Sequence, residues 1–334
     1  MTSMLQVPFV SQDGTLLTAG VSRLRVAEVR DVSDCVRSFR LVAPTSERLP
    51  SWRPGAHLEL VLPSGLVRHY SLCGDPGYET EYEIAVLREP QSRGGSAEMH
   101  DHVRAGDELT LRGQRNHFGL DPASAYLFIA GGVGITPILP MVRAAARQGA
   151  RWRLVYGGRS RSSMAFLDRI AVYGHRVVDV VPQDERGLPE LAREIGAVSA
   201  DTLIYACGPE GLLQAVESAC ADAGRSDSLR LERFAASGEP SPVGQDTAFE
   251  VELRSSGQVV AVPVGTTILE AVRTVLPGTL SSCEEGFCGT CETRILDGTP
   301  EHRDTVLSDE ERAANETMMI CVSRAACPRL VLDM

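Results

Sequence analysis

Residues 126–148 read YLFIAGGVGITPILPMVRAAARQ, an apolar strand that passes through a glycine-rich turn into an apolar helical segment. Further along the chain, WRLVYGG, SMAFLDRIA, TLIYACG and EGLLQAVESACADA continue the alternation of apolar strands and helical segments. Such alternation is typical of a parallel sheet that is covered by helices on both faces. We therefore predict an α/β domain over residues 123–234.

The preceding region, from about Gly20 to Leu120, has a different pattern. Short stretches of alternating apolar and polar residues recur there, separated by Pro, Gly and Asp. These stretches are Leu24–Val29, Phe39–Val42, His57–Leu62, Glu83–Leu87 and Glu108–Leu111. Their spacing predicts an antiparallel β-barrel or sandwich, with domain bounds at residues 20–122.

A third domain is expected at the C-terminus, over residues 247–334. Residues 235–245, AASGEPSPVGQ, have no apolar period and are rich in small residues, so that we predict a linker over 235–246. After it, FEVEL and VVAVPV predict a hairpin. A helix is predicted over Thr267–Leu276, because Thr267 and Glu270 have the spacing of a capping box.

The bulk composition limits the classes of function. The chain has 334 residues, 43% of them hydrophobic and 23% charged, as in ordinary globular proteins of two or three domains. It contains no apolar run long enough to span a bilayer and no secretory signal, and we expect a soluble, cytoplasmic protein. The formal net charge of -11 argues against nucleic-acid binding. Residues 247–334 hold 14 acidic and 7 basic residues, which would suit an electropositive protein partner.

Four of the nine cysteines have a spacing that carries chemistry. Cys283, Cys288 and Cys291 form C-x4-C-x2-C, and Cys321 follows at a distance, which is the spacing of a plant-type [2Fe–2S] site. Gly286 and Gly289 supply the backbone freedom that a loop around such a cluster needs. A structural zinc site is the alternative, although such sites favour two C-x2-C knuckles. Four further cysteines are interpreted as small apolar residues: Cys35, Cys73, Cys220 and Cys327.

Two other segments suggest ligand binding. GGVGITP (131–137) follows a strand and precedes a helix, where backbone amides can approach a pyrophosphate, although the same pattern also fits an ordinary strand-to-helix turn. In RHYSL (68–72), Arg68 could hold a phosphate, Tyr70 could stack on an isoalloxazine ring and Ser71 could reach the flavin N5 edge. Taken alone, RHYSL is also a plain barrel strand.

The joint order of these motifs is more specific than any one of them. RHYSL, RGGS (93–96), GGVGITP, CGP (207–209), ERF (232–234) and the four C-terminal cysteines occur in the order found in phthalate dioxygenase reductase and the vanillate demethylase reductases. The chain resembles this family over nearly its whole length. It is also similar to the reductase portion of self-sufficient cytochromes P450, around residues 112–120 and YGGRSRSSMAFLD (156–168).

The resemblance implies an antiparallel β-barrel flavin domain, an α/β NAD domain and a C-terminal α+β ferredoxin domain of the β-grasp type. It implies FMN rather than FAD, and a path from NADH through FMN and a [2Fe–2S] cluster to a Rieske-type oxygenase. A P450 acceptor and a non-catalytic redox sensor are the alternatives. We expect a monomer that binds neither nucleic acid nor membrane. NADH is expected over NADPH, because Gln183, Asp184 and Glu185 would oppose Arg159 and Arg161 at a 2′-phosphate.

The same resemblance assigns the site residues. Ser71, Cys207 and Phe234 are expected nearest the reacting atoms, with Phe234 shielding the flavin ring. A plug at a domain boundary is the alternative for Phe234, and a core thiol for Cys207. The cluster ligands are Cys283, Cys288, Cys291 and Cys321. The residues expected to bind FMN or NADH are Arg68, Tyr70, Ser71, Leu72, Arg93, Gly95, Ser96, Gly131, Gly132, Gly134, Thr136, Pro137, Arg159, Ser160, Cys207, Gly208, Pro209 and Phe234.

Histidine chemistry is not expected. Hydride and electron transfer through bound cofactors need no general acid and base pair. The seven histidines are scattered along the sequence and are interpreted as non-ligands: His57, His69, His100, His102, His117, His175 and His302.

Overall fold

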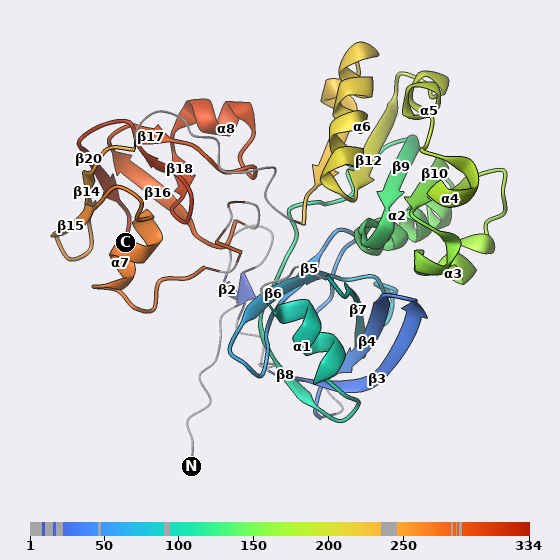
Figure 1. Cartoon of the computed structure of the whole chain (residues 1–334), viewed down its shortest axis with the longest axis horizontal. Helices are drawn as coiled ribbons and strands as arrows, with labels where there is room; N and C mark the ends of the chain where they lie inside the picture. Colours follow the sequence, from blue (N-terminus) through green and yellow to red (C-terminus); the bar gives the residue numbers. More distant parts are fainter. Residues whose placement is uncertain are drawn as a thin grey trace. The chain divides into compact units, whose positions relative to one another are not determined.

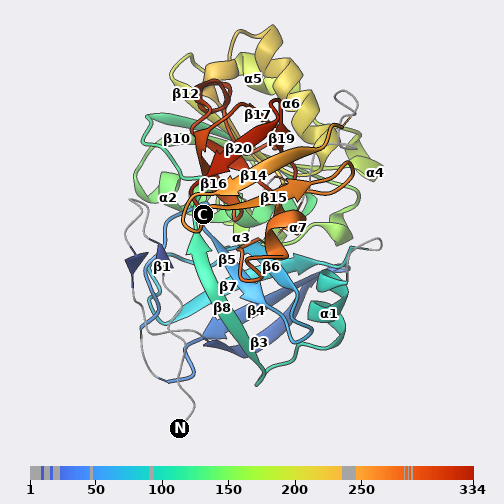
Figure 2. The same ribbon diagram turned by 90° about the vertical axis from the view of Figure 1, so that its left-hand side faces the viewer.

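The computed structural model describes residues 9–10, 16–17, 23–45, 48–89, 94–234, 246–281, 283–284, 286 and 289–334. The chain divides into two compact units, Met1–Glu232 and Arg233–Met334, and each is described by itself (Figures 1 and 2). The predicted linker lies outside the described residues, except for Asp246, whose carboxylate accepts a hydrogen bond from Arg303 at 2.8 Å. The predicted domain bounds stay predictions.

The first unit begins with an antiparallel sheet of six strands. Their order is β6-β5-β8-β3-β4-β7, and an isolated bridge joins Leu72, just after β6, to Ile84 of β7. The inward side chains, which include Leu24, Phe39 and Leu58, form one buried apolar cluster. The elements are β3 (Arg23–Ser33), β4 (Val36–Val42), β5 (His57–Val61), β6 (Val67–Ser71), β7 (Glu81–Leu87), α1 (Gly95–Asp101) and β8 (Glu108–Arg115), preceded by a hairpin of β1 (Phe9–Val10) and β2 (Leu16–Leu17).

A parallel sheet of five strands completes this unit, as the sequence predicts. The strand order is β11-β10-β9-β12-β13, and every neighbouring pair is parallel. The elements are β9 (Ala125–Gly131), η1 (Gly132–Gly134), α2 (Ile135–Arg147), β10 (Arg151–Gly158), η2 (Arg161–Ser163), α3 (Leu167–Ala171), β11 (Val178–Pro182), α4 (Gln183–Arg186), α5 (Leu191–Ala197), β12 (Thr202–Cys207), α6 (Glu210–Asp222), η3 (Ser226–Ser228) and β13 (Leu229–Glu232).

Alternate residues of β9 face two different cores. Tyr126 and Phe128 pack with α2 and α3, whereas Leu127 and Ile129 pack with α5 and α6. The first of these cores also takes in residues of the six-stranded sheet: Val36, Cys73, Ala85 and Phe118. The helices α2 and α3 therefore lie on the side of the parallel sheet that faces the antiparallel one (Figure 1).

The second unit is built on a mixed sheet with the order β15-β14-β20-β16-β18. The predicted hairpin is present as β14 (Phe249–Leu253) and β15 (Gln258–Val262). The capping box is also confirmed, because Thr267 Oγ1 accepts from Glu270 N at 3.1 Å and Glu270 Oε2 accepts from Thr267 N at 2.8 Å. The remaining elements are α7 (Ile268–Arg273), β16 (Glu292–Asp297), β17 (Pro300–Glu301), α8 (Asp309–Ala314), β18 (Thr317–Met319), β19 (Arg324–Ala325) and β20 (Arg329–Leu332).

The helix bounds differ from the prediction in two places. The helix predicted to end at Leu276 ends at Arg273, and the last residues continue as hydrogen-bonded turns. No helix was predicted over Asp309–Ala314, although Ser308 and Glu311 form a second capping box there. None of the described helices combines the length and the apolar character that crossing a bilayer requires.

Candidate functional site

Strand β6 holds the predicted flavin residues on two faces. Tyr70 lies opposite Leu58 and Ser71 opposite His57, so that the two side chains point to different sides of the sheet. The Tyr70 hydroxyl is buried and has no hydrogen-bond partner within the described residues. Burial raises the pKa of Tyr70, which keeps the hydroxyl protonated. An unpartnered buried hydroxyl is costly, and a polar ligand would satisfy it.

Arg68 on the same strand meets the start of α1. Gly94 has a left-handed φ of 87°, and a Cβ on Gly95 would lie 2.4 Å from Arg68 Nε. Only a glycine at 95 therefore lets the guanidinium lie across the beginning of the helix. Ser96 Oγ accepts a hydrogen bond from Glu89 N at 3.2 Å. Arg93 lies outside the described residues.

The glycine turn that follows β9 packs against the end of β12. A Cβ on Gly134 would lie 2.3 Å from Cys207 O, and one on Gly208 would lie 2.9 Å from Gly131 Cα. The two turns, 131–137 and 207–209, therefore meet backbone to backbone. Gly132 differs from these glycines: its φ is +54°, and no described heavy atom lies within 4 Å of the position a Cβ would take.

Side chains around this turn hold its shape. Tyr156 on β10 donates a hydrogen bond to Gly132 O at 3.1 Å, a support that the sequence analysis missed. Thr136 Oγ1 donates to Val133 O at 2.9 Å. Pro137 is the third residue of α2. Its missing N–H is tolerated there because the first turn of a helix has no intrahelical acceptor.

A half-buried glutamate beside Cys207 was also missed. Parallel pairing of β12 and β13 sets Cys207 beside Glu232, and the thiol lies 3.9 Å from Glu232 Oε2. Burial raises the pKa of Glu232 to about 8, with the Cys207 thiol opposing the shift. Burial also raises the pKa of Cys207 well above its usual value, so that the residue is a thiol rather than a nucleophilic thiolate. Glu232 can therefore hold a proton near neutral pH at the edge where the nicotinamide is expected.

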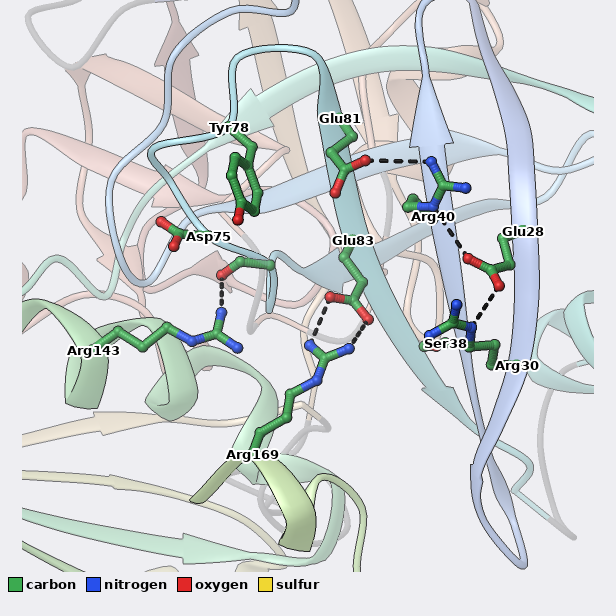
Figure 3. A pocket seen from close by; sticks show the side chains of 11 residues that line it. Glu28, Arg30, Ser38, Arg40, Asp75, Tyr78, Glu81, Glu83, Arg143 and Arg169 are labelled. Atoms are coloured by element: carbon green, nitrogen blue, oxygen red, sulfur yellow. Dashed lines mark hydrogen bonds and ion pairs between the residues drawn. The ribbon is translucent and has the colours of Figure 1, made fainter. Parts of the chain in front are cut away.

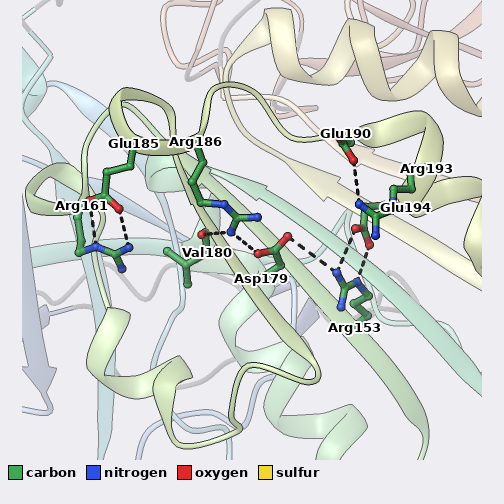
Figure 4. Close-up of polar contacts among 9 residues, drawn as sticks. All are labelled: Arg153, Arg161, Asp179, Val180, Glu185, Arg186, Glu190, Arg193 and Glu194. Carbon is green, nitrogen blue, oxygen red and sulfur yellow. Dashed lines mark hydrogen bonds and ion pairs between the residues drawn. The ribbon is translucent and has the colours of Figure 1, made fainter.

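Arginines and carboxylates line the edge beyond β10 and β11 (Figure 4). Arg161 forms a forked pair with Glu185, with Nη2–Oε2 at 2.9 Å and Nε–Oε1 at 3.2 Å. Arg159 O accepts a hydrogen bond from Asp184 N at 3.1 Å, and Ser160 caps η2. Asp184 and Glu185, which were expected to oppose these arginines, thus lie at this edge, and Glu185 pairs directly with Arg161.

Three histidines that are scattered in the sequence come together in space. The ring centroid of His57 lies 4.8 Å from that of His69 and 6.0 Å from that of His117. Glu59 is buried among them and lies 3.3 Å from Arg112 Nη1. Burial lowers the pKa of His57 well below its usual value, with the neighbouring His69, His117 and Arg115 adding to the shift. This polar group lies on the face of β6 that carries Ser71.

The cysteine loop of the second unit has three described ligand candidates. Cys283, Cys291 and Cys321 are buried, and the Cys321 side chain is within hydrogen-bonding reach of the other two. Cys288 lies outside the described residues. Gly286 and Gly289 have φ of +75° and +74°, as the predicted need for backbone freedom requires. Converging buried thiols are a donor set that fits iron in a [2Fe–2S] cluster.

Phe234 is the last described residue before the segment that was predicted to be the linker. It is 38% exposed and directly precedes the undescribed segment 235–245. Its predicted role therefore stays a prediction.

Comparisons with known proteins agree with this arrangement. The 2Fe-2S iron-sulfur cluster binding domain matches residues 251–326, and the oxidoreductase NAD-binding domain matches residues 128–218. The chain is 42% identical over 316 residues to the phenoxybenzoate dioxygenase subunit beta of Ectopseudomonas oleovorans, covering 93% of this chain and 97% of that one. It is 39% identical over 318 residues to a vanillate O-demethylase oxidoreductase of Pseudomonas putida, covering 92% and 98%.

Solved structures give the same result. Phthalate dioxygenase reductase, described as a modular structure for electron transfer from pyridine nucleotides to [2Fe–2S], matches with a TM-score of 0.70 and 33% identity over 94% of this chain and 98% of that one. An intact type IV self-sufficient cytochrome P450 monooxygenase matches with a TM-score of 0.86 and 40% identity, over 94% of this chain and 41% of that one.

The fold and site thus define an NADH-dependent oxidoreductase with an iron–sulfur domain. The chain belongs to the family of oxygenase reductases that includes phthalate dioxygenase reductase and the vanillate O-demethylase oxidoreductases. FMN, NADH and a [2Fe–2S] cluster are its cofactors, and the residues described above fit each of them.

Replacing Arg68 tests the flavin site. We expect Arg68→Ala to weaken FMN binding by roughly tenfold to a hundredfold, because a charge-assisted contact to a phosphate contributes about 1.5–3 kcal/mol. The dissociation constant is measured by titrating flavin into the apoprotein. Arg23→Ala, at an exposed pair with Glu108, is the control. Unchanged affinity, or FAD as the flavin released by heat, would contradict this reading.

Replacing Glu232 tests the raised carboxyl pKa. Because the folded protein binds this proton more tightly than the unfolded chain, the stability of the wild type falls as pH rises from about 4.5 to about 8. The glutamine of Glu232→Gln cannot ionise, so that the free energy of unfolding of this variant should not show this fall with pH. The variant should therefore gain stability relative to the wild type as pH approaches 8. Urea unfolding at pH 5, 6, 7 and 8 measures the difference. Asp222→Asn, an exposed position on α6, should keep the wild-type slope.

Proposed function

We propose that the chain is the reductase component of an oxygenase system, passing electrons from NADH through FMN and its own cluster to the oxygenase. One observation carries the proposal: RHYSL, the turns 131–137 and 207–209 and the four cysteines occur together in one chain, and 93% of that chain aligns with such a reductase. Bound FMN supplies the needed chemistry, since it accepts electrons in pairs and releases them singly.

The residue roles follow from this proposal. Arg68, Arg93 and Ser96 bind the FMN phosphate with Gly95, while Tyr70, Ser71 and Leu72 line the isoalloxazine ring. The turns 131–137 and 207–209 hold the nicotinamide, and Arg159 and Ser160 lie toward the ribose. Cys207 and Glu232 exclude water and keep a proton at the strand ends. Phe234 covers the flavin, and Cys283, Cys288, Cys291 and Cys321 bind the cluster.

We infer the finer fold from the same relationship. The six-stranded sheet is a closed barrel, a reading supported by the bridge between Leu72 and Ile84 at the two ends of the strand order. The second unit is a β-grasp domain, supported by a hairpin and helix α7 on a five-stranded mixed sheet.

A Rieske-type oxygenase is the proposed partner, because relatives are named as parts of dioxygenase and O-demethylase systems. A P450 acceptor is the second candidate, favoured by the match to a self-sufficient P450. The excess of acid over base in residues 247–334 suits docking on a basic surface of either acceptor. We propose a cytoplasmic monomer.

Removing the second unit tests the order of the carriers. A chain that ends at Gly244 should bind FMN and reduce ferricyanide with NADH, but it should not reduce the oxygenase. Cys288→Ser in the full chain should likewise keep ferricyanide reduction and lose reduction of the oxygenase, because a serine oxygen is a poorer ligand than thiolate for iron. Cys327→Ser, outside the ligand spacing, is the matched control. Full-rate delivery to the oxygenase by the shortened chain would refute the order.

The pair of Arg161 and Glu185 tests the preference for NADH. Glu185 occupies both arms of the Arg161 fork, so that the guanidinium is not offered to a 2′-phosphate. We expect Glu185→Ala to raise kcat/KM for NADPH by roughly tenfold and to leave that for NADH nearly unchanged. Glu190→Ala, at the exposed pair with Arg193, should change neither (Figure 4). A wild type that already prefers NADPH would overturn the assignment.

A further inference from the structure

A polar cavity of about 520 Å³ lies where the two sheets of the first unit meet (Figure 3). Strands β3, β4 and β7 line one side of it, and α2 and α3 contribute Arg143 and Arg169 from the other. Every carboxylate in its lining has an arginine partner: Glu28 with Arg30 and Arg40, Glu81 with Arg40, Glu83 with Arg169, and Asp75 with Arg147. The positive and negative side chains around the cavity therefore neutralise one another. Such pairing is typical of a contact between two parts of a protein rather than of a ligand site.

Three arginines on α2 and α3 form hydrogen bonds with residues of the antiparallel-sheet side. Arg169 forms a fork with Glu83 of β7, with Nη1–Oε2 at 2.7 Å and Nη2–Oε1 at 2.6 Å. Arg143 Nη1 donates to Gly74 O at 2.6 Å and to Cys73 O at 3.3 Å. Arg147 Nη1 donates to Asp75 Oδ1 at 2.9 Å. We call these three arginines and their acceptors the clasp.

The clasp joins the two ligand segments of the unit. Its acceptors at residues 73–75 directly follow RHYSL, and Cys73 N donates to Glu83 O at 2.8 Å, which ties them to β7. Arg143 and Arg147 lie one turn apart on the same face of α2. Because α2 starts at the end of the glycine turn, this one helix spans from the nicotinamide side to the end of the flavin strand.

The position of Arg169 is itself fixed. Its guanidinium lies 4.5 Å from the centroid of the Phe166 ring. Phe166 is buried and has a left-handed φ of 60°, a conformation that a bulky residue adopts only where its surroundings enforce it. The side chains of Arg169 and Glu83 are 27% and 16% exposed, so that water screens this pair less than it screens the surface pairs.

We propose that Arg169, assisted by Arg143 and Arg147, is a positioning residue that sets the spacing between the nicotinamide turn and the flavin strand. The inference rests on the proposed function. The step concerned moves a hydride, one proton with two electrons, from C4 of NADH to N5 of the flavin, so that NADH is oxidised to NAD⁺ and the flavin is reduced. Such a transfer depends steeply on the separation and alignment of the two rings.

The test uses the full chain loaded with its cofactors. Arg169→Ala and the isosteric Glu83→Gln remove the fork, and Arg169→Lys keeps the charge without the fork. The double exchange Arg169→Glu with Glu83→Arg restores a pair with reversed ends. Arg193→Ala, at an exposed pair on α5, away from the clasp, is the control. Stopped-flow flavin bleaching gives the reduction rate and the NADH dissociation constant. The long-wavelength absorbance of nicotinamide stacked on flavin reports the geometry.

We expect Arg169→Ala and Glu83→Gln to slow flavin reduction by roughly tenfold to a hundredfold and to weaken the stacking absorbance, with the NADH dissociation constant within about threefold of the wild-type value. The flavin reduction rate of Arg169→Lys should lie between those of the wild type and Arg169→Ala. The double exchange should recover part of the wild-type rate. Flavin content should stay at the wild-type level, and Glu83→Gln carries the test if Arg169→Ala does not fold.

Wild-type rates and absorbance in both Arg169→Ala and Glu83→Gln would overturn the clasp. So would a loss of rate that merely follows loss of bound flavin, or one that the dissociation constant explains in full. A wild-type flavin that NADH does not reduce would instead refute the proposed function.

Discussion

The approach of two strand ends, at Gly131 and Gly208, is the constraint on which the first unit depends. A Cβ on Gly208 would lie 2.9 Å from Gly131 Cα, and one on Gly131 would lie 2.8 Å from Pro209 Cδ, so that neither position has room for a side chain. This contact brings the carboxyl ends of β9 and β12 together, and parallel strands in such sheets place ligands at that edge. Gly132, between Gly131 and Gly134, is not packed in this way, because no described heavy atom lies within 4 Å of the position its Cβ would take.

The sequence predicts well what local spacing determines. The alternation of strands and helices predicts the parallel sheet, and the capping box predicts the start of α7. The cysteine spacing predicts a loop whose glycines have left-handed backbones, as Gly286 and Gly289 do. Each strand, helix start or loop in these patterns is marked by residues that lie close together in the sequence, where chain geometry limits the alternatives. The end of α7 was less predictable, because Thr274 to Leu276 continue in turns that differ little from helix in sequence.

The remainder of the site depends on pairings between distant segments. Glu232 meets Cys207 only because β13 pairs with β12, and His57 meets His117 only because β5 pairs with β8. Likewise, Tyr156 of β10 reaches Gly132 because β10 pairs with β9, the strand that Gly132 follows. Strand order is a property of the whole sheet, and the local sequence around these residues does not indicate which strands will pair. An ERF motif can be recognised as a unit without revealing that its glutamate lies beside the Cys207 thiol.

The chain contains no lysine, so that all 33 of its lysine and arginine positions are arginine. A guanidinium presents a planar fork, whereas an ammonium is a point charge that its acceptors can approach from many directions. The pairs of Arg153 with Glu194, Arg161 with Glu185 and Arg169 with Glu83 all use both arms. Each pair thus fixes an orientation as well as a distance. Where two sheets meet across a polar cavity, that difference determines whether the contact only attracts the two sides or also aligns them.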